Sequence, residues 1–400
     1  METGSTTAPP RYTRAQVDHC AFTAWYPSFD HVSIKSAVVP LPPAFVSLIL
    51  TDGVVLPEAL SSKQTTAEQQ QQALQTVREQ VDAAIRRFKG KVFPKLNWTS
   101  PRDASWMLGT MQCVNFEDVF LLLKSSDFAV HDISEAYAGC VKEDESATTG
   151  GGSTGNTSAA LAKPNGPENV YLVLKKWCSF FDSMLFRCFV VNHALVGVSQ
   201  RNCDEYYPFL FNQQDHLCEL IYTFFDTHFR KSSSGGAKKK KSSKFPDPDY
   251  IFDVYVDKQH RVYLLDINVF GAVTDPLLFS WEELLELRDA HLRSNPPRKA
   301  GDSDDESDDG DDDDDVHEVV DFRIVESELS IRPNPLSGYR VPTDLVDHLA
   351  GGAGFEAFME QVKKDNANGD DEGGSSSEDD DGDQDEDDDD GVIWGSDNDD

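Results

Sequence analysis

The stretch Ile251–Pro276, IFDVYVDKQHRVYLLDINVFGAVTDP, constrains the fold most, because it predicts two short strands joined by a turn. Residues 251–256 and 261–267 both follow an alternating pattern, which is typical of β-strands. The polar residues 257–260 separate the two runs by the length of a hairpin loop. The sequence therefore predicts a β-hairpin against which the rest of the chain must pack.

The polar side chains of this hairpin are expected to gather on one face, because alternate residues of a strand point the same way. That face of the second strand carries Val262, Leu264, Asp266 and Asn268. We expect the hairpin to pair Val256 with Arg261. Asp253 then lies opposite Leu264 and diagonal to Asp266, at roughly 7–8 Å between Cα atoms. Two carboxylates and one amide thus converge on one patch.

Asp253, Asp266 and Asn268 are therefore the candidate metal ligands. Their oxygens are hard ligands, of the kind that Mg²⁺ takes when it also binds the phosphates of a nucleotide. An ordinary alternative exists, since Asp-x-Asn followed by Gly271 often marks a strand that ends in a turn. The apolar surroundings favour the metal site, because an acid and an amide within an apolar strand must find partners or remain as costly buried polar groups.

The net charge of −35 is concentrated in two acidic blocks, residues 302–315 and 370–400. These blocks hold 11 and 17 acids and no base, and the rest of the chain carries only −7. An acidic chain repels phosphate backbones, so we expect no binding to nucleic acid. No apolar run reaches membrane-spanning length, so we expect no membrane association. Seven scattered cysteines without a Cys-x-x-Cys pair predict reduced thiols in the cytosol.

The chain is expected to form one globular region with flexible additions. We expect a disordered N-terminus over residues 1–16, a globular domain over 17–350 and a disordered acidic tail over 365–400. Flexible polar insertions are expected at residues 141–167, 231–244 and 299–317. Long surface insertions cost little free energy, so these segments should loop out of the domain.

The apolar patterns elsewhere predict an α+β fold. Helices are expected at residues 62–88, 216–229, 281–292 and 341–362. Strands are expected at residues 34–41, 170–176, 185–191 and 195–200, of which the last two form a hairpin. Residues 116–124 fit either a helix or a strand.

The irregular segment 92–106, VFPKLNWTSPRDASW, carries Lys95 and Arg102 beside two tryptophans. A loop with fixed cations next to rigid rings suits phosphate or anion binding. The alternative is a loop that Trp98 and Trp106 simply pack on the core. Lys175 and Arg187 lie within expected strands and could also bind phosphate. The alternative is that they are ordinary edge or surface residues, which is the commoner role of a lysine in a strand.

A series of longer motifs resembles one protein family. The motifs are, in order, FTAWYPSFDHVSIKS, PKLNWTSPRDASWM, FLLLKSSDF, LVLKKWC, FRCFV, GVSQRNCDEYY, FDVYVD and LLDINVFGAVTDPLLFSWEEL. They resemble the cell division cycle protein 123 family over most of residues 18–290 and again near 322–332. The resemblance implies an ATP-grasp fold, in which two α+β subdomains clasp ATP and Mg²⁺. It also implies a cytosolic chaperone that binds the gamma subunit of eukaryotic translation initiation factor 2 and promotes assembly of that heterotrimer. We expect the chain itself to be a monomer.

The resemblance also implies roles for individual residues. Asp253, Asp266 and Asn268 match the metal-binding positions, which agrees with the shared face of the hairpin. The positions implied for the nucleotide are Lys95 and Lys175 at the phosphates, Lys176, Trp177 and Cys178 along the adenine, Arg187 at a phosphate or the metal, and Trp98, Ser100 and Arg102 in the nucleotide loop. The chain departs from the family in its long insertions and in Val269, where a proline is expected.

Three functions remain open at this point. The first is an ATP-binding assembly chaperone, and the second is an ATP-grasp ligase that activates a carboxylate through an acyl phosphate. Magnesium and cationic side chains would serve either, since phosphoryl transfer depends mostly on positioning and charge stabilisation. The third is an interaction protein with a vestigial nucleotide site, which the presence of all three candidate metal ligands disfavours. Consumption of ATP only in the presence of a small acid and an amine would identify a ligase.

Overall fold

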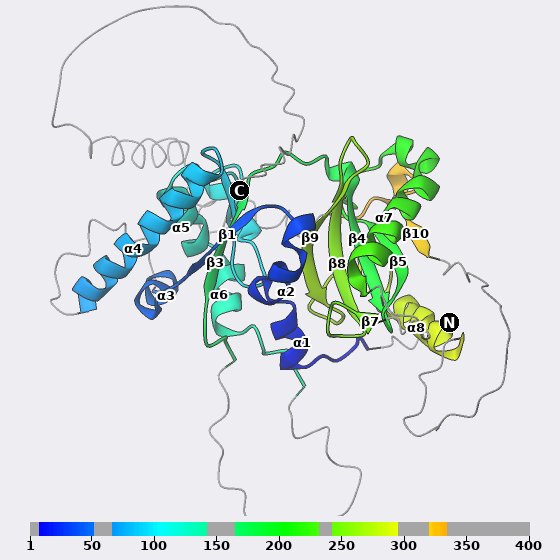
Figure 1. Ribbon diagram of the computed structural model, residues 1–400, viewed down its shortest axis with the longest axis horizontal. Helices are drawn as coiled ribbons and strands as arrows, with labels where there is room; N and C mark the ends of the chain where they lie inside the picture. Colours follow the sequence, from blue (N-terminus) through cyan, green and yellow to red (C-terminus); the bar gives the residue numbers. More distant parts are fainter. Residues whose placement is uncertain (1–7, 52–65, 142–164, 232–241, 295–319, 334–400) are drawn as a thin grey trace, which may run out of the picture. The chain divides into compact units, whose positions relative to one another are not determined.

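The computed structural model describes residues 8–51, 66–141, 165–231, 242–294 and 320–333, all within the compact unit Met1–Ser337 (Figure 1). The expected insertion at 299–317, the expected helix at 341–362 and the expected tail at 365–400 lie outside the described residues. So does most of the expected insertion at 141–167. The insertion at 231–244 begins and ends in two short antiparallel strands, β6 (Arg230–Lys231) and β7 (Ser242–Ser243).

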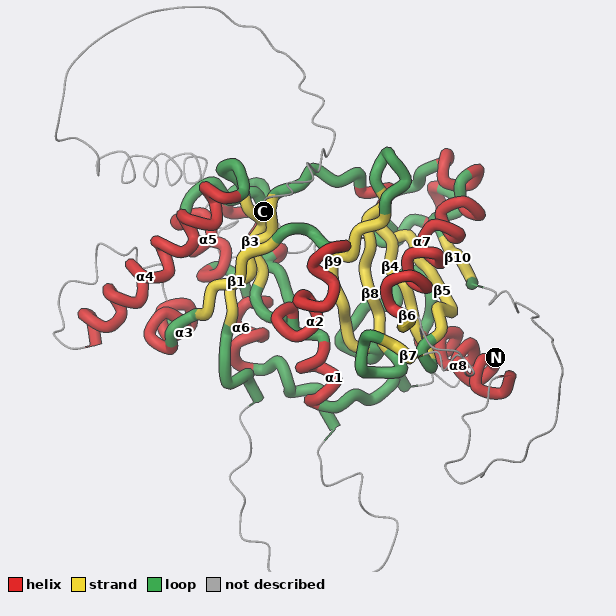
Figure 2. Tube along the Cα trace, in the orientation of Figure 1, coloured by secondary structure: helices red, strands yellow, loops and turns green. Residues whose placement is uncertain are grey.

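A first lobe combines a three-stranded antiparallel sheet with the helices beside it (Figure 2). Its strands are, in sheet order, β1 (Ser36–Pro40), β3 (Tyr171–Lys176) and β2 (Val92–Lys95). Its helices are α3 (Pro43–Leu50), α4 (Thr66–Arg87), α5 (Phe116–Lys124) and α6 (Asp127–Ser134). Apolar residues of these helices and strands form one buried cluster, so the ambiguous segment 116–124 is a helix that packs by its apolar face.

A second lobe is built on a five-stranded sheet in the order β10-β5-β4-β8-β9. Its strands are β4 (Leu185–Val191), β5 (Ala194–Gln200), β8 (Tyr250–Val256), β9 (Val262–Val269) and β10 (Asp321–Arg323), and only β10 pairs in parallel. The two predicted hairpins, β4–β5 and β8–β9, are therefore confirmed. The two lobes give the α+β architecture that the sequence predicted.

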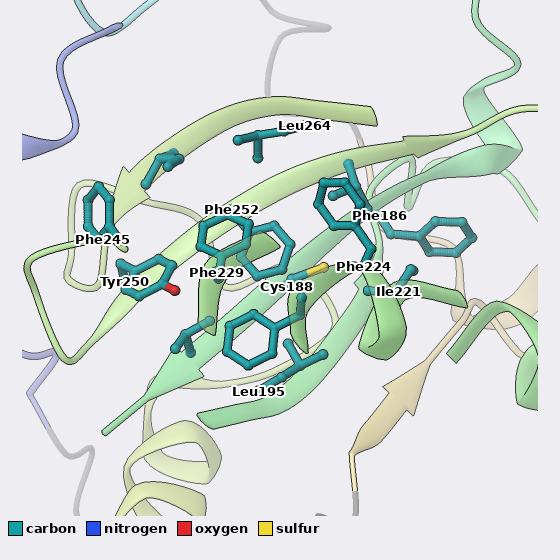
Figure 3. Packing of buried hydrophobic residues seen from close by; sticks show 14 of the residues in the cluster. Phe186, Cys188, Leu195, Ile221, Phe224, Phe229, Phe245, Tyr250, Phe252 and Leu264 are labelled. Carbon is teal, nitrogen blue, oxygen red and sulfur yellow. The ribbon is translucent and has the colours of Figure 1, made fainter. Parts of the chain in front are cut away.

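Helix α7 (Gln214–Phe229) covers one face of this sheet with an aromatic core, seen closely in Figure 3. The rings of Phe229 and Phe252 lie with centroids 4.7 Å apart, and both side chains are fully buried. Burying one such side chain stabilises the fold by about 1.5–3 kcal/mol. Helix α8 (Trp281–Ser294) packs on the opposite face, against Phe189 and Ile251.

The register of the β8–β9 hairpin differs from our expectation. Val256 pairs with Val262 rather than Arg261, and a β-bulge then inserts Leu265 as an extra residue. Because a bulge shifts the alternation of faces, Leu264 joins the buried core. The prediction that Val262 and Leu264 share the face of Asp266 and Asn268 is therefore wrong. The bulge also places Asp253 directly opposite Asp266 instead of diagonal to it.

The N-terminal residues are more ordered than predicted. Helix α1 (Arg14–His19) begins inside the segment that we expected to be disordered, and Thr13 closes a capping box on it. Tyr12 is buried and packs closely against Gly271. A Cβ atom on that glycine would lie only 2.5 Å from the tyrosine ring. The prediction of disorder over residues 1–16 is thus wrong for its described second half. Helix α2 (Phe22–Phe29) follows and contributes to the core of the second lobe.

Candidate functional site

A cavity of about 530 Å³ lies where β2, β3 and the loop after β2 meet strands β4, β8 and β9. This volume is within the usual range for small-molecule and cofactor sites. Eleven of the twelve predicted site residues line it, namely Trp98, Ser100, Arg102, Lys175, Lys176, Trp177, Cys178, Arg187, Asp253, Asp266 and Asn268. The twelfth, Lys95, is buried behind the wall and reaches Asp266 with its ammonium group. The structure therefore brings all twelve residues together.

One face of the second sheet has two roles. Helix α8 covers this face at one end of the strands, and the uncovered part at the other end forms the floor of the cavity. Phe189 and Ile251 pack under α8. Two residues further along their strands, on the same face, Arg187 and Asp253 line the cavity instead. Strand pairing thus places charged side chains where the helix no longer covers the sheet.

Asp266 is held by a buried lysine. The Nζ of Lys95, which is only 1% exposed, donates to Asp266 Oδ2 at 2.7 Å and also to the carbonyl of Trp98. The backbone N–H of Ile267 donates to the other carboxylate oxygen at 3.1 Å. A buried ammonium needs such partners, because an unpaired buried charge is strongly unfavourable.

Asp253 is held by two arginines. Arg187 donates from Nε and Nη2 to its two oxygens, at 2.8 and 2.9 Å, and Arg201 donates from Nε at 3.1 Å. Burial opposes ionisation of Asp253, but the charges of Arg187 and Arg201 outweigh it and hold the pKa of the carboxyl well below its usual range. Arg187 also donates from Nη1 to the carbonyl of Asp275 at 2.7 Å.

Asn268 differs from the two acids, because its buried amide nitrogen has no hydrogen-bond partner among the described residues. No group of three His, Cys, Asp or Glu side chains within the described ranges is placed to hold a metal ion. A metal here would therefore need the amide oxygen of Asn268 and oxygens of a ligand in addition to the two carboxylates. Such a mixed set fits Mg²⁺, which commonly takes one or two carboxylates together with substrate phosphates.

The charge of the cavity lining favours an anion. Five basic and three acidic side chains line it, although the whole chain carries −35. Lys175 donates to the carbonyl of Leu265 at 2.6 Å, and burial lowers the pKa of Lys175 to about 8. The guanidinium of Arg102 forms no hydrogen bond or ion pair with any described residue, and it lies 5.8 Å from the ring centroid of Phe93. Both cations are thus available to a ligand.

One wall of the cavity is apolar. The aliphatic and aromatic residues that line it include Ile34, Phe93, Trp177, Phe180, Leu185 and Leu265. The rings of Phe93 and Trp177 lie with centroids 6.5 Å apart. Flat apolar side chains beside cationic ones suit a ligand with a planar ring at one end and a charged group at the other.

The loop after β2 both packs on its surroundings and lines the cavity, which are the two alternatives that the sequence left open. Asp132 of α6 accepts hydrogen bonds from the backbone N–H groups of Trp98 and Thr99, at 3.1 and 2.8 Å. The indole of Trp98 donates to the carbonyl of Val17 at 2.8 Å and lines the cavity. The loop is therefore packed on its surroundings and presents side chains to the cavity as well.

Sequence reasoning missed several lining residues, of which Arg201 matters most. It follows β5 directly, and it shares Asp253 with Arg187. The motif GVSQRNCDEYY contained it, yet nothing in the local pattern singled out an arginine just beyond a strand end. Phe180 and Asp182 also line the cavity, and they lie between β3 and β4 in a short connection without a periodic signal.

Comparison with known proteins gives consistent matches. The sequence profile of the family described as D123 matches residues 25–349. Cell division cycle protein 123 of Aspergillus terreus is 38% identical over 296 residues, which cover 70% of this chain and 65% of that relative. The translation initiation factor eIF2 assembly protein of Xenopus tropicalis is 33% identical over 84% of this chain and 93% of its own. The chain thus spans slightly less than two thirds of the fungal relative's length and nearly all of the frog relative's.

The solved structure of Cdc123 from Schizosaccharomyces pombe is similar to this chain, with a TM-score of 0.53 and 34% identity. The match covers 69% of this chain and 94% of that structure. None of the helices within the described ranges is both long and apolar enough to cross a membrane. The profile match spans most of the chain, and the fold and the relatives agree with it, so this chain belongs to the D123 family.

Proposed function

We propose that this chain is an ATP-binding assembly factor for eukaryotic translation initiation factor 2, and that it binds the gamma subunit of that factor. The observation that supports ATP binding is the cavity that eleven of the twelve predicted site residues line, with a cationic and an apolar part. The observation that supports assembly is the similarity to the frog relative, which is named an eIF2 assembly protein. This name favours a chaperone over the ligase that the sequence also allowed.

In this proposal the apolar wall receives the adenine and the cations receive the phosphates. Trp177 and its neighbours Lys176 and Cys178 form the adenine side of the cavity. Lys175 and Arg102 bind phosphate oxygens, because each is a cation without a carboxylate partner among the described residues. Asp253, Asp266 and Asn268 hold Mg²⁺, which would neutralise phosphate charge when bound.

Calorimetric titration with ATP tests the nucleotide site. We expect binding in Mg²⁺ that is lost in EDTA, and at least tenfold weaker binding by Asn268→Ala. This variant is suited to the test because the amide nitrogen of Asn268 has no internal partner to lose. Asn212→Ala, the same change on an exposed residue outside the cavity, is the matched control. Equal ATP affinity of Asn268→Ala and wild type, or affinity unaffected by EDTA, contradicts the proposed site.

Co-elution with purified gamma subunit tests the partner. We expect a complex at micromolar concentration, and the same experiment with and without Mg²⁺-ATP measures what the nucleotide controls. Absence of co-elution under both conditions would count against the gamma subunit. We further propose that the chain works in the cytosol, since all seven cysteines are free thiols, and that it is a monomer. Light scattering of the purified chain checks the monomer.

A further inference from the structure

The N-terminal segment over residues 10–22 contacts both lobes, and the proposed function gives it no role. It consists of a short irregular stretch, helix α1 and the first residue of helix α2. Figure 1 shows α1 and α2 next to strand β9, on the side of the first lobe. We call residues 10–22 the N-terminal strap.

Tyr12 of the strap lies between two glycines that belong to different lobes. Gly139 follows α6 of the first lobe, and Gly271 follows β9 of the second. A Cβ atom on either glycine would overlap the tyrosine side chain. The backbone N–H of Val141 also donates to the carbonyl of Tyr12 at 2.9 Å. The buried Tyr12 therefore packs on both lobes at once.

The helical part of the strap continues this connection by hydrogen bonds. The indole N–H of Trp98, in the loop after β2 of the first lobe, donates to the carbonyl of Val17 at 2.8 Å. On the side of the second lobe, His19 Nδ1 lies 3.0 Å from a carboxylate oxygen of Asp247, just before β8. The strap thus links the two lobes at more than one point.

A small cavity of about 100 Å³ connects the strap with the proposed nucleotide site. Tyr12 and Val17 line it together with Trp98 and Asn268, and the last two also line the cavity proposed for the nucleotide. A cavity beside two side chains removes part of the packing that would otherwise fix them. The position of Trp98 therefore depends on its hydrogen bond to Val17 of the strap.

The proposed nucleotide site needs groups from both lobes at a fixed spacing. The cations Lys175 and Arg102 come from β3 and the loop after β2, whereas the candidate metal ligands come from β8 and β9. Phosphates with bound Mg²⁺ would have to meet both sets together. Binding groups of this kind need to be held within about 0.5 Å of their productive geometry. Contacts that set the spacing of the lobes therefore control affinity.

We propose that Tyr12 is a positioning residue for the nucleotide site, because it fixes the spacing between the loop that carries Trp98 and strand β9, which carries Asn268. The proposal rests on the proposed function, since it concerns the ATP site. Tyr12 does not line the nucleotide cavity, so it acts through the strap and not through contact with the ligand. Its ring keeps the lobes at a distance at which the carbonyl of Val17 can accept from Trp98.

Calorimetric titration with Mg²⁺-ATP tests this role. We expect Tyr12→Ala to bind about tenfold more weakly than wild type, and Tyr12→Phe, which keeps the ring, to bind within about twofold of wild type. Leu284→Ala is the control for general destabilisation, because Leu284 is fully buried under α8 within the second lobe and lines none of the cavities. It should lower the unfolding temperature and leave ATP affinity unchanged.

A milder variant tests the same contact from the first lobe. Gly139 is exposed, and an added methyl group there would meet only the Tyr12 side chain, at its hydroxyl end. We expect Gly139→Ala to weaken Mg²⁺-ATP binding about threefold, and to have a smaller effect in a Tyr12→Phe background, which lacks the hydroxyl. This variant decides the question if Tyr12→Ala does not fold.

The exchange of the Trp98 indole proton with solvent gives a readout without nucleotide. It is followed by NMR in the ligand-free chain, and Trp98→Phe assigns the signal. We expect Tyr12→Ala to speed this exchange at least about tenfold, because the hydrogen bond to Val17 then opens more often, and Leu284→Ala to leave it unchanged.

The outcomes separate this role from the proposed function. If wild type binds Mg²⁺-ATP and both Tyr12→Ala and Gly139→Ala bind it equally well, the positioning role is overturned and the ATP site stands. An equal loss of affinity in Leu284→Ala, or unchanged indole exchange in Tyr12→Ala, also overturns it. If wild type does not bind Mg²⁺-ATP, the proposed function fails, and the role of Tyr12 fails with it.

Discussion

Replacing Asp253 with asparagine should strongly destabilise the second lobe. The Asp253 side chain is 4% exposed, and it is the carboxylate partner of Arg187, which is 9% exposed. Removing one partner of a buried ion pair leaves the other charge uncompensated, at a cost of about 3–5 kcal/mol. We expect the lower end of that range, because Arg187 keeps its bond to the carbonyl of Asp275 and the 27% exposed Arg201 can turn toward water.

Thermal and urea unfolding measure this effect. A loss of about 3 kcal/mol should lower the midpoint temperature of a domain this size by roughly 5 °C or more. Asp289→Asn is the matched control, because Asp289 forms an exposed ion pair with Arg288 on helix α8. That substitution should change stability by less than about 0.5 kcal/mol.

The pH dependence of the loss follows from the lowered pKa of Asp253. A carboxyl with a depressed folded-state pKa stabilises the fold above its unfolded pKa of about 3.9 and loses that contribution as pH falls through the folded value. The difference between wild type and Asp253→Asn should therefore be constant from pH 5 to 8. A double variant with Arg187→Met should cost less than the two single changes together. Additive costs, or an Asp253→Asn protein within about 1 kcal/mol of wild type, would refute the reasoning.

Two further predictions concern charge. ATP affinity should fall as pH rises from 7 to 9, because Lys175 has a pKa of about 8 and loses the positive charge that attracts phosphate. Lys175→Arg, which stays charged, should flatten this pH profile in calorimetric titrations. An unchanged slope in that variant would exclude Lys175 as a phosphate ligand. The chain should not shift a labelled RNA or DNA oligonucleotide at low micromolar concentration and physiological salt, since its net charge is −35, and a salt-sensitive shift would contradict this.

The sequence predicted the hairpin because its signals are local. Alternation over 251–256 and 261–267 and a short polar turn are enough to specify two paired strands. The bulge at Leu265 was not predictable, since an apolar residue in a strand carries no sign that it will be the extra one. The acids nevertheless reached the same cavity, because the bulge brought Asp266 and Asn268 to the face of Asp253.

Contacts between distant segments account for what sequence patterns missed. Arg201 gains its place from the pairing of β4 with both β5 and β8, which brings its carboxylate partner from 52 residues away. Tyr12 is ordered by Gly271 and by the backbone of Val141, neither of which is near it in sequence. Periodicity describes an element by itself, whereas these residues depend on tertiary packing.

The pairing of charges in the cavity bears directly on how a magnesium nucleotide would enter it. Lys95 and Arg187 now satisfy Asp266 and Asp253, so no carboxylate is left buried without a partner. In the proposed complex, Arg187 would donate to a phosphate oxygen, and Asp253 and Asp266 would each offer a carboxylate oxygen to Mg²⁺, whose charge would replace part of the pairing that these acids have without it. Each buried charge then exchanges one partner for another, and binding need not leave any of them unpaired. The ion pairs of Lys95 with Asp266 and of Arg187 with Asp253 explain why the site can be charged and still remain folded without its ligand.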